Sequence, residues 1–140
     1  MVKIGIASLK FKILINSHFA KYLCIFVYVK LNIQMKVRVV TEVSIYDYCS
    51  KNSRALPSFH IFLERLKNCN WNNLNDIKAD FPNLSIVGDC ENNRIVFDIG
   101  GNNYRMICDY NFYKKCCLYV AFIGTHAEYD KVDACTIQIY

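Results

Sequence analysis

The sequence contains little glycine or proline and no long apolar run. Five glycines and two prolines among 140 residues exclude a collagen-like repeat and a low-complexity chain. No uninterrupted apolar segment approaches the 18 or more residues that an ordinary membrane-spanning helix needs. Hydrophobic residues make up 54% of the chain and charged residues 21%, which excludes an intrinsically disordered protein. The length predicts one domain with a single hydrophobic core.

Acidic residues are absent from residues 1–34, which carry five of the 17 basic residues. The 12 basic residues that remain balance the 12 acidic residues, so residues 35–140 are neutral by count. A neutral body does not attract nucleic acid by bulk charge. Any site for an anion must therefore be built by the local placement of a few cations.

Residues 1–34 show neither a clear helical nor a clear strand period, whereas a strand pattern begins directly after Met35. We interpret residues 1–34 as an extension that is non-native or disordered, with Met35 as the natural start. Residues 35–140 are then the folded domain. The alternative is that the extension is an anchor on a membrane surface. Its apolar run Tyr22 to Val29 is too short to span a bilayer.

The eight cysteines include no Cys-x-x-Cys pair. Their spacing matches neither a zinc site nor a compact disulfide framework. We expect free thiols in a reducing cytoplasm, most of them acting as small core residues. A disulfide or a metal-binding role is the alternative.

The first part of the body predicts a strand followed by helices. β-branched residues predict the strand over 36–40, and Thr41 and Asn73 are candidate helix caps. The expected helices span 42–49, 57–69 and 73–79. On the first helix, Val43 and Tyr46 share one side that we expect to pack in the core. The second helix has an amphipathic repeat, formed by Phe59, Phe62, Leu63, Leu66 and Cys69.

From residue 84 the period changes from 3.6 to 2, which predicts strands. The expected strands span 84–87, 94–99, 104–110 and 115–123. A strand, then helices, then an antiparallel meander predicts an α+β fold with the helices on one face of the sheet.

The turn Gly100-Gly101-Asn102-Asn103 predicts a hairpin and its register. Asp98 then faces Arg105, and Arg94 faces Asp109. One face of the hairpin is apolar and belongs under the helices; it comprises Ile95, Phe97, Ile99, Tyr104, Met106 and Cys108. The opposite face is expected to be open, with two guanidinium groups held by carboxylates. It is either an ordinary solvated face or a site for phosphate.

The segment from Thr125 to Lys131 follows the last strand directly. His126 can exchange a proton near neutral pH, and Tyr129 offers a phenol. Side chains at a strand end can meet residues of neighbouring strands, so His126 and Tyr129 can approach Arg105. The alternative is that His126 is a surface or capping histidine.

Three segments together resemble the HigB family of type II toxins. They are Asp76-Ile-Lys-Ala-Asp-Phe-Pro82, Arg94-Ile-Val-Phe-Asp-Ile-Gly-Gly-Asn-Asn-Tyr-Arg105 and Phe122-Ile-Gly-Thr-His-Ala-Glu-Tyr-Asp130. The resemblance implies a RelE-like fold and a cytoplasmic endoribonuclease that cuts messenger RNA on the ribosome and so inhibits translation. It also implies a HigA-type antitoxin with a helix-turn-helix domain as partner, and no stable membrane association. A non-catalytic protein that binds an antitoxin and co-represses its operon is the alternative.

The resemblance further implies chemistry without a metal or other cofactor, in which the RNA 2′-hydroxyl attacks the adjacent phosphorus. His126 is then the leading acid or base, and Tyr129 assists it or stacks on a base. Arg105 stabilises the phosphate charge. The supporting RNA-binding cations are Arg94, Lys78 and Lys131.

Overall fold

The structure is a computed structural model that describes residues 37–140. The expectation for residues 1–34, and the start at Met35, lie outside the described residues. The elements are the strands β1 (Val37–Val39), β2 (Ser85–Val87), β3 (Arg94–Ile99), β4 (Tyr104–Asn111) and β5 (Cys116–Thr125), the helices α3 (Glu42–Lys51), α4 (Leu56–Leu66), α5 (Leu74–Asp80) and α6 (His126–Tyr129), and the short 3-10 helix η1 (Ser53–Ala55).

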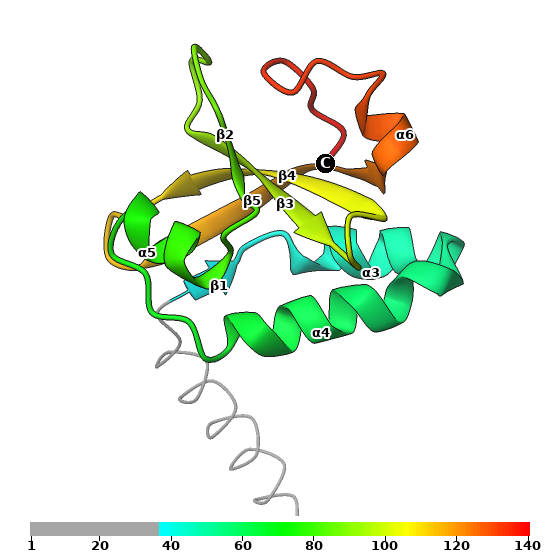
Figure 1. Cartoon of the computed structure of the whole chain (residues 1–140), viewed down its shortest axis with the longest axis horizontal. Coiled ribbons are helices and arrows are strands. Elements are labelled where there is room, and N and C mark those ends of the chain that lie inside the picture. The colour runs from blue at the N-terminus through cyan, green and yellow to red at the C-terminus, as the bar shows by residue number, and fades with distance from the viewer. Residues whose placement is uncertain (1–36) are drawn as a thin grey trace, which may run out of the picture. The chain divides into compact units, whose positions relative to one another are not determined.

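The five strands form one sheet in the order β1-β5-β4-β3-β2. β1 runs parallel to β5, and the other neighbours are antiparallel. Figure 1 shows α3 and α4 on one side of this sheet. The α+β prediction is confirmed, and the architecture is consistent with a RelE-like fold. Among the described helices, none is long and apolar enough to cross a membrane.

The buried face of α4 agrees with the sequence prediction, whereas α3 buries a different face from the predicted one. In α4, Phe59, Phe62 and Leu66 are buried as predicted. In α3, however, the predicted core residues Val43 and Tyr46 are exposed, and other positions of the helix pack inward. The candidate cap Thr41 also does not cap this helix, because its hydroxyl accepts a hydrogen bond from the Val120 backbone N–H at 2.8 Å.

The hairpin between β3 and β4 has the predicted register. Asp98 pairs with Arg105, and Arg94 pairs with Asp109. The turn needs three consecutive positive φ angles, at Gly100, Gly101 and Asn102, a conformation that glycine and asparagine adopt most readily. The predicted apolar face of the hairpin packs in the main core beneath the helices.

The opposite face of the hairpin is covered, which corrects the expectation of an open face. Val96 and Ile107 are buried there in a second core cluster. The cover comes from α6 and from residues 130–140, which we call the C-terminal strap; Figure 1 shows both on the side of the sheet away from α3 and α4. The sequence pattern missed this cover because the strap forms no regular strand or helix.

Two fastenings hold the C-terminal strap on the sheet. The Arg94 guanidinium donates to the backbone oxygens of Ala134 and Ile137, at 3.0 and 2.8 Å. Cys135 of the strap forms a disulfide with Cys90, in the loop before β3. The expectation of free thiols is therefore wrong for this pair. It is confirmed for the five other cysteines of residues 37–140, of which four are buried: Cys49, Cys69, Cys108 and Cys116.

Candidate functional site

The short helix α6 positions the candidate histidine. Thr125 and Glu128 form a capping box: the Glu128 N–H donates to the Thr125 hydroxyl, and the Thr125 N–H donates to the Glu128 carboxylate at 2.7 Å. The His126 N–H donates to the carbonyl of Asn103 in the hairpin turn, at 3.1 Å. No helix was predicted at this position, although Thr-x-x-Glu is a helix-start signal.

Gly124, which pairs with Arg105 on the neighbouring strand, leaves room for α6 to fold back. A Cβ at this position would lie 2.5 Å from the Phe122 ring and 3.1 Å from the Glu128 carboxylate. Glycine is required here because both neighbours are fixed: Phe122 is buried in the second core cluster, and Glu128 closes the capping box.

Arg105 contacts both Asp98 on β3 and Tyr129 on α6. Its Nη1 contacts the Asp98 carboxylate, and its Cζ lies 5.7 Å from the centre of the Tyr129 ring. Only 14% of the side chain is exposed. Its Nε is buried and has no hydrogen-bond acceptor within residues 37–140. The guanidinium is thus held by a carboxylate and an aromatic ring.

His126 lies at the start of α6 with 43% of its side chain exposed. Its Nδ1 is 3.3 Å from an oxygen of Asp130, four residues later, at an angle unsuited to a hydrogen bond. The Asp130 carboxylate therefore lies beside Nδ1. Nε2 makes no hydrogen bond with the described residues and is the nitrogen available to exchange a proton with a ligand.

Tyr48, on α3, also belongs to the surroundings of α6. Burial raises the pKa of Tyr48 to about 12, and the negative charge of Glu128 adds to the effect. The ring packs against Phe59 and Tyr104. At neutral pH the phenol is therefore a fixed neutral group beside the site.

The three cations predicted to support RNA binding do not all lie near Arg105 and α6. Arg94 has a side chain that is 1% exposed and bound to Asp109 and the C-terminal strap, so its structural role replaces the expected contact with phosphate. Lys78 is exposed on α5, which Figure 1 shows at the end of the sheet opposite α6. Lys131 is exposed directly after α6. Of these cations, Lys131 alone adjoins α6.

A metal ion has no evident ligand set in the described part of the chain. Within residues 37–140, no three His, Cys, Asp or Glu side chains gather closely enough to hold one. The groups at this end of the sheet are instead a guanidinium, an imidazole and a phenol, from Arg105, His126 and Tyr129. They can bind an anion and transfer a proton.

Comparison with known proteins decides the family. Residues 57–132 match the HigB toxin family, described as the RelE-like toxic component of a toxin–antitoxin system. The chain belongs to the HigB toxin family. It is also 28% identical over 96 residues to the mRNA interferase HigB of Escherichia coli O6:H1 (strain CFT073), covering 69% of this chain and 91% of the relative. As a HigB-type toxin, it has an antitoxin as its partner.

Proposed function

We propose that this toxin is an endoribonuclease that cuts messenger RNA on the translating ribosome. One observation supports the proposal. Arg105 on β4 contacts Asp98 and lies against the ring of Tyr129, and Tyr129 is on α6, the helix that also contains His126. This is a cation beside a proton-transfer group, which phosphodiester cleavage requires. The printed name of the Escherichia coli relative, an mRNA interferase, supports the same activity.

The proposed reaction is attack of the RNA 2′-hydroxyl on the adjacent phosphorus. The 2′-oxygen forms a bond to phosphorus and loses its proton, the bond to the 5′-oxygen breaks, and that oxygen gains a proton. The products are a 2′,3′-cyclic phosphate and a free 5′-hydroxyl. His126 acts as acid or base through Nε2, Arg105 stabilises the developing negative charge, and Tyr129 holds the guanidinium and stacks on a base.

We further propose a HigA-type antitoxin with a helix-turn-helix domain, and action in the cytoplasm. The neutral body makes ribosome binding depend on local cations, among which Lys131 adjoins α6 and Lys78 lies on α5. These two lysines remain candidates for contacts with the RNA or ribosome backbone.

The test combines growth arrest with RNA cleavage by the full chain. Expression should stop bacterial growth, and His126→Ala should lower the cleavage rate by about 10²- to 10⁴-fold. Arg105→Ala should cost about 2–4 kcal/mol of transition-state stabilisation, and Arg105→Lys should rescue only part because it lacks the planar fork. His60→Ala, at an exposed position on α4, is the matched control and should keep the parent rate.

Thermal melting is measured on every variant, because loss of fold also lowers activity. A folded His126→Ala, Arg105→Ala double variant that cuts RNA at the parent rate would refute the site. A parent protein that binds antitoxin without cutting RNA would support the non-catalytic alternative.

A further inference from the structure

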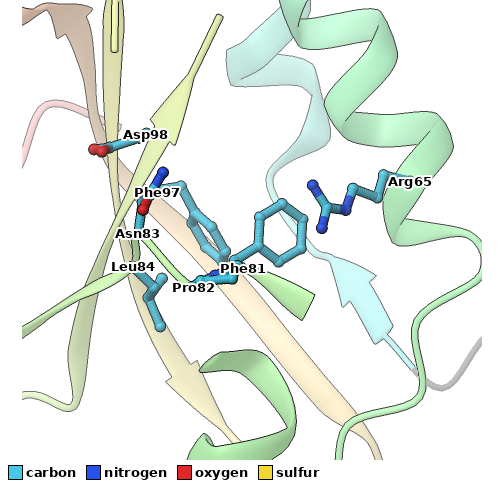
Figure 2. A pocket seen from close by; sticks show the side chains of 7 residues that line it. All are labelled: Arg65, Phe81, Pro82, Asn83, Leu84, Phe97 and Asp98. Atoms are coloured by element: carbon cyan, nitrogen blue, oxygen red, sulfur yellow. The ribbon is translucent and has the colours of Figure 1, made fainter. Parts of the chain in front are cut away.

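Three carboxylates lie at the candidate site, and each has a different position. Asp98 on β3 contacts the guanidinium of the site, and Figure 2 shows its carboxylate on the side of the strand away from the Phe97 ring. Asp130, directly after α6, lies beside Nδ1 of His126. Glu128 lies within α6, and its carboxylate forms no ion pair within residues 37–140. The task of this third carboxylate therefore has to be found in its hydrogen bonds.

The Glu128 carboxylate is engaged with the start of its own helix. It accepts hydrogen bonds from the backbone N–H and from the hydroxyl of Thr125, at 2.7 and 2.9 Å. The same hydroxyl accepts a hydrogen bond from the Glu128 backbone N–H at 3.3 Å. The first backbone N–H groups of a helix have no partner within the helix, so these bonds satisfy donors that α6 would otherwise leave free.

The cap matters because α6 is short. A helix of four residues is not stable by itself, since forming the first turn costs more than its hydrogen bonds return. His126 begins this helix and Tyr129 ends it, with the Tyr129 ring beside the Arg105 guanidinium. If α6 opened, the imidazole and the phenol would both move away from their places relative to Arg105.

We propose that Glu128 is a positioning residue, which holds His126 and Tyr129 beside Arg105 through the capping box and transfers no proton itself. The inference rests on the function proposed above and names the residue that orders its site. The competing assignment makes Glu128 a general acid or base. Glutamine separates the two roles, because it keeps the acceptor oxygen of a capping box but cannot exchange a proton.

The first experiment measures RNA cleavage by the full chain with substitutions at Glu128. Glu128→Ala should lower the rate by about 2- to 30-fold, the factor that corresponds to the loss of a helix cap. Glu128→Gln should restore most of this loss and keep the pH dependence of the parent. A carboxylate that transfers a proton would instead lose about 10²- to 10⁴-fold in the glutamine variant.

The second experiment changes the other half of the box. Thr125→Val keeps the shape of the side chain without its hydroxyl and should lower the rate by a similar factor, whereas Thr125→Ser should restore most of it. The double variant Thr125→Val, Glu128→Ala should fall little below either single variant, because the two side chains act as one unit. The matched control is Glu91→Ala, an exposed carboxylate in the loop between β2 and β3, which should keep the parent rate.

A third measurement follows α6 without RNA. The Asp130 backbone N–H donates to the His126 carbonyl at 3.1 Å, so hydrogen exchange at this amide reports the opening of the helix. Exchange there should be about 2- to 30-fold faster in Glu128→Ala and close to the parent in Glu128→Gln. Thermal melting of each variant checks that the rest of the domain is folded.

The outcomes separate the two proposals. A Glu128→Gln variant that loses as much activity as Glu128→Ala, with unchanged exchange at Asp130, overturns the positioning role and makes Glu128 a proton-transfer group. A folded Glu128→Ala variant that cuts RNA at the parent rate also overturns it. A parent that cuts no RNA overturns the proposed function, and with it the catalytic part of this inference. Unchanged exchange at Asp130 in Glu128→Ala overturns the hold on α6 itself.

Discussion

Replacing Arg94 is the strongest test of how the C-terminal strap is held. The guanidinium donates to Asp109 at 2.6 Å, to the Ala134 and Ile137 carbonyls at 3.0 and 2.8 Å, and to the Gln138 side chain at 3.1 Å. Arg94→Met keeps an apolar stem of similar length and removes every one of these donors. We expect it to lower the free energy of unfolding by about 3–5 kcal/mol, because removing one partner of a buried pair leaves the other unpaired.

The magnitude follows from what is left behind. The Asp109 side chain is 27% exposed, so water can solvate it again and its share of the loss falls toward the lower end. The two strap carbonyls lose their donor, and a buried acceptor without a partner costs about 1–3 kcal/mol. For a domain of about 100 residues, each kcal/mol lowers the melting temperature by about 4–8 °C, so the expected drop is about 12–40 °C.

The assay is urea unfolding followed by circular dichroism, with thermal melting beside it. Arg54→Met is the matched control: Arg54 is exposed on η1, and its loss should change stability by less than about 0.5 kcal/mol. Arg94→Lys should fall between the two, since an ammonium keeps the charge but cannot reach all four acceptors. If Arg94→Met behaves like Arg54→Met, the strap is not held by this guanidinium and the reasoning is refuted.

Four further outcomes are expected. Cys135→Ser should lower the free energy of unfolding by about 4 kcal/mol, the loop-closure value for a separation of 45 residues, and a reductant should destabilise the parent but not this variant in a melting experiment. Iodoacetamide at pH 8 should label the half-buried Cys117 at least about tenfold faster than Cys116, read by mass spectrometry, because burial raises the pKa of Cys116 to about 12. Since this pKa lies above the ordinary value, the thiol's contribution to stability is complete below about pH 9 and is lost as the pH rises toward 12, which urea unfolding against pH should show. Gly124→Ala should cost about 1–3 kcal/mol by crowding the Phe122 ring; an unchanged melting temperature would mean that the ring has room to move.

Local patterns in the sequence were sufficient for the hairpin between β3 and β4 and for the cap at Asn73, although the capping box of α6 was missed. The Gly100-Gly101 turn and the alternation of residue types determine the register that places Asp98 against Arg105, because a slip by one residue would turn the apolar face outward. The cap at Asn73, whose side chain accepts the backbone N–H groups of Asn75 and Asp76, follows from the same kind of rule.

Only the tertiary structure distinguishes Arg94 from Arg105, which the sequence pattern treats alike. Arg94 and Arg105 share one face of the hairpin and each faces an aspartate, yet the C-terminal strap buries the first while the second lies against Tyr129 of α6. The pairing of Cys90 with Cys135 has the same origin, since it depends on where an irregular segment lies on the sheet. A segment that lacks a helical or strand period, such as the C-terminal strap, is positioned by contacts with residues distant in sequence. A pattern read along the sequence does not show such contacts.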